Sequence, residues 1–287
     1  MNDLIHEIWM SQLKLENDGW YLERYGSAKD IFEMKKKILC PDCISANDCL
    51  QLNDIKRKKE TEKIAEYCIN NSVSAVTRSH GKYPRMLGFI GDPPKLLYIK
   101  GIVDNSRKCV AIVGSRNPSP YGLKCATFFA KELSENGYVI VSGLALGIDS
   151  RAHITALENG GTTYSVLGSG LGNIYPVQNT GLAEQIASAG ALMTEYPPYA
   201  APDRWHFPER NRIVSGICHA VLIVEGKENS GSLITAAHSI EQGREVFCIP
   251  GNIFSENSRG VNALINDGAR LVNRPEEIIG YLEGLNY

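Results

Sequence analysis

The sequence contains no run of 18 apolar residues and no basic N-terminal stretch followed by an apolar one. The first absence excludes a membrane-spanning helix, and the second leaves no secretory signal visible. We therefore expect a protein without membrane contact that stays in the cytoplasm. The chain has 287 residues, of which 43% are hydrophobic and 22% charged, as in ordinary globular proteins. This length suits one large domain with a small appendage, or two modest domains.

A strong charge imbalance is also missing, since the formal net charge is −2. This argues against a protein that coats duplex DNA through bulk charge, so any nucleic-acid binding must come from a local patch. Cys40 and Cys43 have the inner spacing of a zinc knuckle, but a second close Cys or His pair is missing. We expect no metal there and interpret most of the eight cysteines as reduced thiols in apolar runs.

Three common catalytic or cofactor-binding motifs are absent. There is no G-x-x-x-x-G-K-[ST] string, so P-loop hydrolysis is not expected. Gly168–Gly172 fails the dinucleotide fingerprint, because Ile174–Pro176 follows where a helix should begin. No Gly-x-Ser-x-Gly nucleophile elbow appears either. We therefore expect neither a standard cofactor nor a serine nucleophile.

Residues 1–76 are rich in lysine and glutamate and carry apolar residues at helical spacing, for example from Leu4 to Leu13 and from Ile64 to Cys68. This pattern predicts a small helical N-terminal domain. Two basic runs lie in it, Lys35–Lys37 and Lys56–Lys59. We interpret them as solvated helix faces, and a role in nucleic-acid binding is the alternative.

Residues 77–287 predict a second domain of a different kind. After a connecting stretch over residues 77–98, short β-branched runs alternate with helical segments, which indicates a buried, mostly parallel sheet covered on both faces. The fold class is therefore α/β, a Rossmann-like doubly wound domain preceded by the small helical one. The predicted strands are 110–113, 139–141, 164–167, 191–194, 221–224 and 246–249, and the predicted helices are 121–136, 149–159, 179–188, 208–217, 231–242 and 259–267.

Glycine and small polar residues follow five of the predicted strands. In an open parallel sheet, ligands bind outside the carboxyl ends of the strands, where glycines allow close approach and helix N-termini offer N–H groups to an anion. Each loop alone also fits a structural strand end, but the five together predict a groove for a phosphate-bearing ligand. The candidate residues are Gly114, Ser115, Arg116, Ser142, Gly143, Gly168, Ser169, Gly170, Ser230, Gly231, Ser232 and Gly251.

The segment Phe207–Gly216 concentrates further chemistry. Arg210 and Arg212 carry forked donors suited to phosphate, and the Asn211 amide between them can read a base edge or a backbone carbonyl. The segment predicts a helix whose first turn carries cationic and amide donors, which favours an anion. A surface helix with ordinary solvated arginines is the alternative.

Two pairs of residues could support catalysis instead. Asp149 and His153 lie four residues apart on one predicted helix face, which is a spacing that suits a catalytic acid–base pair. We expect instead that Asp149 caps the start of the helix and that His153 packs against it. Glu195 and Glu225 end two strands on the groove side, so a carboxylate pair is possible, although loop hydrogen bonds explain them as well.

The order of these motifs resembles the DprA/Smf family. The resemblance covers about residues 80–273, and the helical region resembles the small domain that precedes the Rossmann core in that family. The matching segments are Gly114–Arg116, Ser142–Asp149 with His153, Tyr175-Pro176 with Asn179, Phe207–Arg212, Ser230–Thr235, Gly243-Arg244, Pro250-Gly251, Gly260, Asn262 and Gly268-Ala269.

The resemblance implies a DNA-processing protein of natural transformation. Family members bind incoming single-stranded DNA, protect it, and help load the RecA recombinase while displacing single-strand-binding protein. They are regarded as non-enzymatic and tend to form homodimers through the Rossmann domain. Carried over by position, the implied DNA contacts are Ser115, Arg116, Gly143, Arg210, Asn211 and Arg212.

The chain departs from the family pattern at Leu146, where members often carry a basic residue. Loss of that phosphate contact should weaken binding or shift it to Arg151 and Lys124 nearby. Some members also append a winged-helix domain, and we expect none here because the chain ends soon after Tyr281–Gly284.

The leading hypothesis is thus a single-stranded DNA-binding mediator and not an enzyme. Such binding needs backbone cations and stacking platforms, which Arg116, Arg210 and Arg212 and the rings of Phe207, Tyr121 or Trp205 could supply. The rival hypothesis is a phosphoribohydrolase-like enzyme on a related Rossmann fold, with Glu195 or Glu225 as its acid. The acidic proline- and glycine-rich loop of such enzymes is absent. A protein scaffold is a third reading, but it leaves the arginine loops unexplained.

Overall fold

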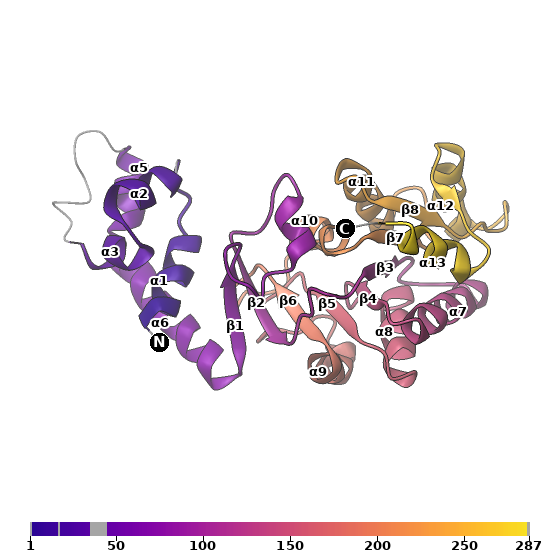
Figure 1. Ribbon diagram of the computed structural model, residues 1–287, viewed down its shortest axis with the longest axis horizontal. Helices are drawn as coiled ribbons and strands as arrows, with labels where there is room; N and C mark the ends of the chain where they lie inside the picture. Colours follow the sequence, from indigo (N-terminus) through magenta and orange to yellow (C-terminus); the bar gives the residue numbers. More distant parts are fainter. Residues whose placement is uncertain (1, 17, 35–44, 286–287) are drawn as a thin grey trace.

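The computed structural model describes residues 2–16, 18–34 and 45–285, which form a helical region and a larger sheet region (Figure 1). None of the helices in these ranges combines the length and the apolar character needed to cross a membrane. The fold class is confirmed, because a mostly parallel sheet is covered by helices on both faces and is preceded by short helices. The basic run Lys35–Lys37 and the pair Cys40 and Cys43 lie outside the described residues.

The helical region is built around its own core. Trp9, Leu13, Tyr21, Ile31 and Leu52 are all buried there and pack into one hydrophobic cluster. Polar caps fix the starts of three of the helices. The side-chain oxygens of Ser27, Ser45 and Asp54 accept backbone N–H groups that have no partner inside the helix. The helices are α1 (Asn2–Ser11), α2 (Asp18–Tyr25), α3 (Ala28–Glu33), α5 (Ala46–Leu52) and α6 (Ile55–Asn70).

The described residues form one nine-stranded sheet with the strand order β1-β2-β6-β5-β4-β3-β7-β8-β9. The strands β1 and β2 pair antiparallel with each other, and β2 pairs antiparallel with β6, whereas all remaining pairs are parallel. The strands are β1 (Val73–Thr77), β2 (Leu96–Gly101), β3 (Cys109–Val113), β4 (Val139–Ser142), β5 (Thr163–Val166), β6 (Ala191–Thr194), β7 (Ala220–Ile223), β8 (Glu245–Cys248) and β9 (Arg270–Leu271).

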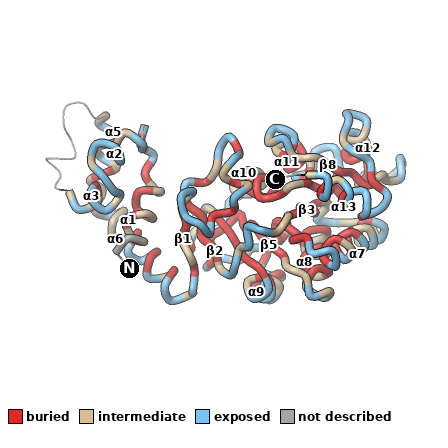
Figure 2. Tube along the Cα trace, viewed as in Figure 1, coloured by how far each residue is buried: buried red, intermediate tan, exposed pale blue. Residues whose placement is uncertain are grey.

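Helices cover both faces of this sheet, and the buried residues follow the strands through the middle of the region (Figure 2). One face carries α7 (Pro120–Glu135), α8 (Ile148–Glu158), α9 (Thr180–Ala189) and α13 (Pro275–Glu283). The other face carries η1 (Arg85–Phe89), α10 (His206–Ile217), α11 (Gly231–Glu241) and α12 (Glu256–Asn266). Because β3 and β7 are buried on both sides, their side chains are apolar without alternation.

The helical region packs against the edge of the sheet region that carries β1. Ile8, Ile64 and Cys68 join a hydrophobic cluster that also contains Tyr98 of β2 and Leu192 of β6. A further short helix, η2 (Val177–Asn179), leads into α9. The two regions therefore share a core, although each also has one of its own.

The predicted strands and helices of the sheet region are confirmed to within one to three residues. The stretch over residues 77–98 is corrected, because it contains η1 and the start of β2. The apolar run of β2 was too short to assign from its pattern, and pairing with β1 and β6 decides it. The strand β1 also extends across the predicted domain boundary at residue 76. Five cysteines are free thiols that are buried or half-buried, as predicted: Cys68, Cys109, Cys125, Cys218 and Cys248.

Candidate nucleic-acid interface

A cleft of about 1120 Å³ opens at the carboxyl ends of β3, β4 and β7. The strands β3 and β7 are neighbours, and the chain continues from β3 to β4 on one side and from β7 to β8 on the other. Loops that diverge from a switch point leave a crevice between them, which is where doubly wound sheets bind ligands. The cleft therefore lies where the sequence predicted a groove.

The loop after β3 forms one wall of the cleft. Gly114, Ser115, Arg116 and Asn117 all line it. The backbone of this loop is fixed, because the Ser115 hydroxyl accepts the N–H of Asn117 at 3.1 Å and the Ser115 carbonyl accepts the N–H of Ile148 at 3.1 Å. Arg116 is exposed and has no ion-pair partner among the described residues. Its guanidinium is therefore available to an anion.

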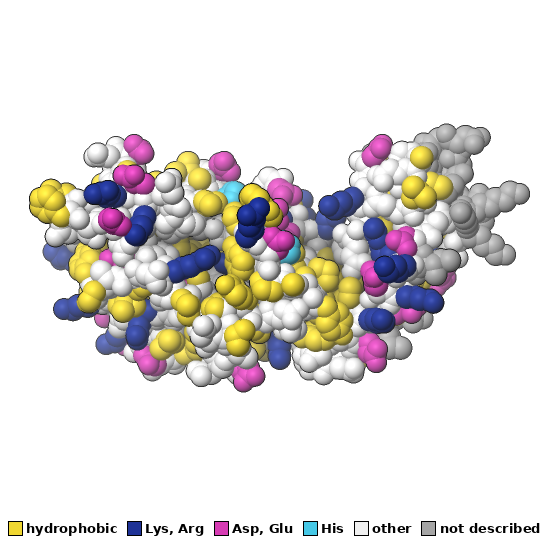
Figure 3. Space-filling model, turned by 180° about the vertical axis from the view of Figure 1, so that it is seen from behind, with side chains coloured by type: hydrophobic (Ala, Val, Ile, Leu, Met, Phe, Trp, Pro, Cys, Tyr) yellow, Lys and Arg dark blue, Asp and Glu magenta, His cyan; other side chains and the backbone are white. Residues whose placement is uncertain are grey.

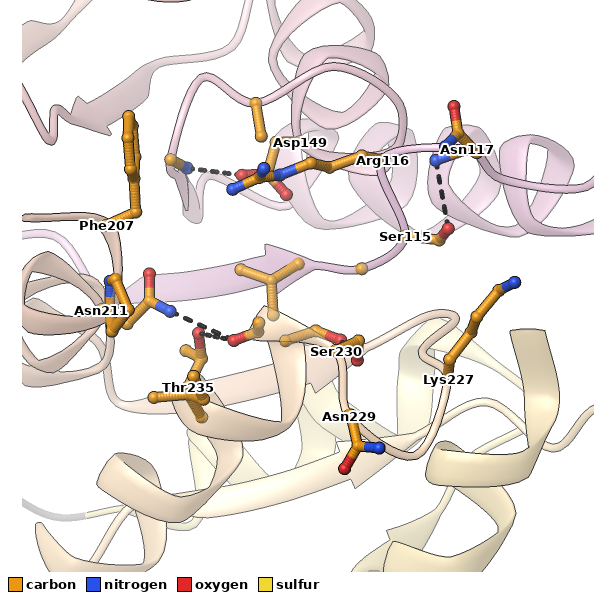
Figure 4. Close-up of a pocket in the computed structure, with 18 of the residues that line it drawn as sticks. Ser115, Arg116, Asn117, Asp149, Phe207, Asn211, Lys227, Asn229, Ser230 and Thr235 are labelled. Atoms are coloured by element: carbon orange, nitrogen blue, oxygen red, sulfur yellow. Dashed lines mark hydrogen bonds between the residues drawn. The ribbon is translucent and has the colours of Figure 1, made fainter. Parts of the chain in front are cut away.

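The guanidinium of Arg116 points across the opening towards Phe207 at the start of α10 (Figure 4). Its central carbon lies 5.8 Å from the centre of the Phe207 ring, and that ring lies 5.5 Å from the ring of Tyr175. Phe207 is half-buried and Tyr175 is 46% exposed, and both line the cleft. A cation and two aromatic rings thus share one part of the cleft wall.

Arg210 has a different environment from the one expected for a phosphate contact. It is only 4% exposed, and its guanidinium donates to the Gly143 carbonyl at 2.7 Å and to the Val166 carbonyl. Burial lowers the pKa of Arg210 to about 10, and the nearby Asp149 carboxylate partly offsets this. Arg210 therefore holds the loops after β4 and β5 together from inside the cleft wall.

Two glycines make this arrangement possible. A Cβ atom at Gly143 would lie 2.5 Å from the Arg210 guanidinium. Gly147 has a φ of +86°, and a Cβ atom there would lie 2.4 Å from the Ser115 carbonyl oxygen. A side chain at Gly143 would displace Arg210, and one at Gly147 would push apart the loops after β3 and β4. These glycines are required for close packing of the loops.

The start of α11 forms the opposite wall. Ser230, Gly231 and Ser232 line the cleft, and no side chain caps the first turn of the helix among the described residues. The first amides of a helix have no partner inside it and carry the positive end of the helix dipole. Asn211 fixes this helix against α10, because its side-chain amide donates to the Gly231 carbonyl at 3.1 Å. The wall thus presents backbone donors to the cleft.

The rim of the cleft contains residues that the sequence reasoning did not single out. Among the described residues, its lining includes five cationic side chains and three carboxylates. Arg204 and Arg259 are exposed there, and Lys227 pairs with Glu256 at 2.7 Å. Arg204 lies three residues before Phe207, so starting the Phe207–Gly216 segment three residues earlier would have included it. Lys227 and Asn229 come from the loop after β7, and Glu256 and Arg259 come from the first turn of α12. Only the fold brings these two segments to the cleft.

Six predicted contact residues do not line the cleft, and each of them contacts another segment of the chain. The Ser142 hydroxyl donates to the Ile112 carbonyl at 2.7 Å, and the Ser169 hydroxyl donates to the Asn173 carbonyl at 2.6 Å. Arg212 pairs with Glu195 at 2.6 Å and with Asp92 at 3.3 Å. The remaining three are glycines that lie against other segments: Gly168, Gly170 and Gly251.

The candidate catalytic groups are engaged in structural contacts. Asp149 does not cap α8, which corrects our expectation; Gly147 precedes the helix, and the buried Asp149 carboxylate accepts the Gly143 N–H at 3.0 Å. His153 is fully buried, and its Nδ1 atom lies 2.6 Å from the Thr163 hydroxyl. Burial lowers the pKa of His153 to about 3. The imidazole is therefore neutral at physiological pH and is a poor proton acceptor.

The two strand-end carboxylates also fail to meet in the cleft. Glu225 accepts hydrogen bonds from the backbone and the hydroxyl of Ser119 at 2.9 and 2.5 Å, which fixes the start of α7. Glu195 is held by Arg212, and burial raises the pKa of its carboxyl group. Neither residue lines the cleft. Among the described residues, no group of three or more His, Cys, Asp or Glu side chains could hold a metal ion.

Taken together, the fold and the cleft define a Rossmann-like protein with a polar cleft at its switch point. The family model for DNA recombination-mediator protein A matches residues 74–283. The chain is 42% identical over 217 residues to DNA processing protein DprA of Bacillus subtilis, covering 75% of this chain and 73% of that protein. It is 41% identical over 234 residues to DprA of Streptococcus pneumoniae, covering 81% and 79%. The chain therefore belongs to the DNA recombination-mediator protein A family, as the DprA/Smf resemblance predicted.

Two solved structures agree with this assignment. The crystal structure of DprA from Streptococcus pneumoniae matches with a TM-score of 0.80 and 33% identity, and the match covers 100% of this chain and 99% of that one. DprA from Helicobacter pylori, whose structure gave insights into its single-stranded DNA binding mode, matches with a TM-score of 0.65 and 31% identity. This second match covers 73% of this chain and 95% of that one.

Proposed function

We propose that the cleft binds single-stranded DNA. The observation that carries the proposal is that a free arginine, two aromatic rings and an uncapped helix start face one opening: Arg116, Phe207 with Tyr175, and Gly231 at the start of α11. Proteins that bind single strands combine cations along the backbone with rings on which bases stack. The relative from Helicobacter pylori binds single-stranded DNA and has a similar fold, which supports the proposal.

The same features favour a single strand over a duplex. The rings of Phe207 and Tyr175 can stack only on bases that are not already stacked in a helix. The net charge of −2 gives the whole molecule no field that would attract duplex DNA. Binding depends instead on the local cations of the cleft. We therefore expect a clear preference for unpaired DNA.

Sequence preference should be weak. Arg116 and the first amides of α11 suit phosphate oxygens, which are the same at every nucleotide. Of the two roles expected for the Asn211 amide, reading a base edge or bonding a backbone carbonyl, the structure has the second, since the amide donates to the Gly231 carbonyl. Stacking on an aromatic ring is available to every base. The cleft thus selects for an unpaired strand more than for a sequence.

The geometry does not favour the phosphoribohydrolase alternative. That reaction needs an acidic group beside the bound nucleotide, but Glu195 and Glu225 lie outside the cleft lining and are engaged with Arg212 and Ser119. Three other carboxylates line the cleft. The Asp149 carboxylate is buried and bonded to the Gly143 N–H, Glu256 is paired with Lys227, and Glu228 is exposed. We therefore assign the protein a binding role and no catalytic one.

Within this function, we place the protein in natural transformation. It protects incoming single strands in the cytoplasm and loads the RecA recombinase onto them while single-strand-binding protein is displaced, acting as a homodimer. Membership of a recombination-mediator family supports this assignment. The test is RecA filament formation on a strand coated with single-strand-binding protein, followed with and without this protein. No acceleration in its presence would contradict the assignment.

The binding proposal itself is tested by fluorescence anisotropy with a labelled single-stranded oligonucleotide over a series of salt concentrations. Affinity should fall steeply with salt, by a slope of about 0.7 in log–log terms for each phosphate contacted. A duplex of the same sequence serves as the control. Equal affinity for both, or no salt dependence, would contradict the proposal. A nucleotide-release assay on the same samples tests the enzymatic alternative.

A further inference from the structure

The helix α6 carries a row of basic side chains that leads away from the sheet region. Lys56, Lys59 and Lys63 are exposed and are followed on the same face by Tyr67, since the four residues are spaced by three or four positions. None of the three lysines has an ion-pair partner among the described residues. At 1.5 Å per residue, the row from Lys56 to Tyr67 is about 17 Å long. We call these four residues the α6 row.

The α6 row ends at a loop that belongs to the cleft. The Tyr67 ring lies 5.3 Å from the ring of Tyr199, nearly edge-on. Tyr199 is 58% exposed and lies three residues before Pro202, which lines the cleft together with Arg204. Three residues of extended chain span at most about 11 Å. The α6 row and the cleft are therefore joined by the short segment from Tyr199 to Pro202, which we call the bridge.

The bridge is held rigidly. The carbonyl of Pro198 accepts the N–H of Gly172 at 2.9 Å, and the carbonyl of Ala200 accepts the N–H of Gly170 at 3.0 Å. A Cβ atom at Gly170 would lie 2.1 Å from the carbonyl oxygen of Pro197, so the two loops are in close contact. Near the cleft end of the bridge, the Arg204 guanidinium lies 4.7 Å from the ring of Trp205, which is 62% exposed. Exposed rings and a cation thus continue beyond the cleft opening.

The view from behind shows how side chains of each type are distributed at the junction of the two regions (Figure 3). Hydrophobic side chains gather at the junction between the two regions, and Lys and Arg side chains lie beside them on the helical region (Figure 3). Exposed aromatic rings next to cations are the combination that holds unpaired nucleic acid.

We propose that single-stranded DNA leaving the cleft crosses Trp205 and Tyr199 and continues along the α6 row, with its phosphates at Lys63, Lys59 and Lys56. This inference rests on the proposed function of the cleft. The inference gives the helical region a direct part in DNA binding. It also implies that a strand too long to fit within the cleft binds more tightly than a short one.

The test compares a short oligonucleotide of about 6 nucleotides, which occupies the cleft, with a long one of about 30 nucleotides. The short one is within the range of known single-strand binding sites, about 4–16 nucleotides, and the long one exceeds it. In the Lys56→Ala/Lys59→Ala/Lys63→Ala variant, affinity for the long strand should fall at least tenfold at low salt while affinity for the short strand stays unchanged. Three lost phosphate contacts should also reduce the salt slope for the long strand by about 2.

A matched pair on the same helix controls for bulk charge. Glu60 adjoins the α6 row, whereas Glu62 lies on another face of the helix, and both are exposed. Glu60→Lys should raise affinity for the long strand, and Glu62→Lys should leave it unchanged. An equal gain from both, or no loss in the triple-alanine variant, would overturn the inference and leave the cleft in place. If the wild-type protein fails to bind both oligonucleotides, the proposed function of the cleft fails, and the inference falls with it.

Discussion

The Arg210 guanidinium donates a hydrogen bond to the Gly143 carbonyl oxygen at 2.7 Å, and it fills the space that a side chain at position 143 would need. The most conspicuous cation of the sequence motif is therefore part of the frame of the cleft. It joins α10 to the loop after β4 and lies near the buried carboxylate of Asp149. Arg116, one loop away, is exposed in the cleft and has no ion-pair partner among the described residues.

Arg210→Ala should destabilise the fold more than it affects any bound strand directly. The change removes the donors to two buried carbonyls and leaves Asp149 without its neighbouring positive charge. Leaving a buried acceptor without its donor costs about 1–3 kcal/mol, and more where a charged group is involved. Urea unfolding measures the loss. Wild-type stability combined with lost DNA affinity would instead place Arg210 at the DNA, as the sequence motif suggested.

Arg116→Ala should weaken binding of single-stranded DNA roughly ten- to hundredfold, because a hydrogen bond to a charged group contributes about 1.5–3 kcal/mol. The thermal midpoint should not change, since the side chain is exposed and makes no ion pair among the described residues. Anisotropy titrations measure the affinity. Arg270→Ala is the matched control, because Arg270 is exposed on β9 at the end of the sheet. Equal losses in both variants would rule out the assignment of Arg116.

Phe207→Ala should reduce the affinity for single-stranded DNA by about 1–3 kcal/mol, the range measured for stacking of a base on a ring. Phe207→Trp should keep most of the affinity, because a ring remains at the position. The position of the ring can also be tested through its neighbour Gly168. A Cβ atom at Gly168 would lie 2.7 Å from the Phe207 ring, so Gly168→Ala should displace the ring and lower the affinity for single-stranded DNA. Unchanged binding in all three variants would mean that bases do not stack there.

Leu146→Lys should tighten binding modestly at low salt. Leu146 is 42% exposed and follows Ala145, which lines the cleft, so a lysine there adds a cation beside the opening. The gain should vanish at high salt, because salt screens an exposed charge. Isotherms at two salt concentrations measure it, with Ile240→Lys near the far end of α11 as the control. No gain at low salt would mean that the side chain points away from the strand.

Acid should destabilise the fold through His153. Burial holds the pKa of His153 at about 3, whereas an unfolded histidine titrates near 6.5. Between these two values the unfolded chain binds the extra proton, so stability is full above about pH 6.5 and falls as the pH drops, by about 1.4 kcal/mol per pH unit. Urea unfolding at pH 7 and pH 5 measures the loss. His153→Gln should reduce it, and an identical pH dependence in that variant would show that other groups cause it.

The sequence by itself determined the fold class and the edge of the sheet at which ligands bind. The buried strands are continuous apolar runs, so the residues of β3, β4 and β6 indicate a two-sided core without reference to any partner. Each strand of the predicted groove is also followed within two residues by glycine or serine, and parallel strands bring those ends to one edge. The local pattern of residues was sufficient for both conclusions, because the burial of a strand determines which residues it contains and the backbone geometry of a parallel sheet determines where its strands end.

Only the tertiary structure decided which of the conspicuous residues face the cleft. A motif gives no information on whether an arginine is buried, and the neighbours of Arg210 and Arg212 come from segments far away in the sequence: Gly143 and Val166 for the first, Asp92 and Glu195 for the second. The rim residues Lys227 and Arg259 likewise meet the cleft only because β7 and β8 lie side by side. Side-chain burial and loop approach depend on packing between distant segments, and a single sequence does not specify that packing locally.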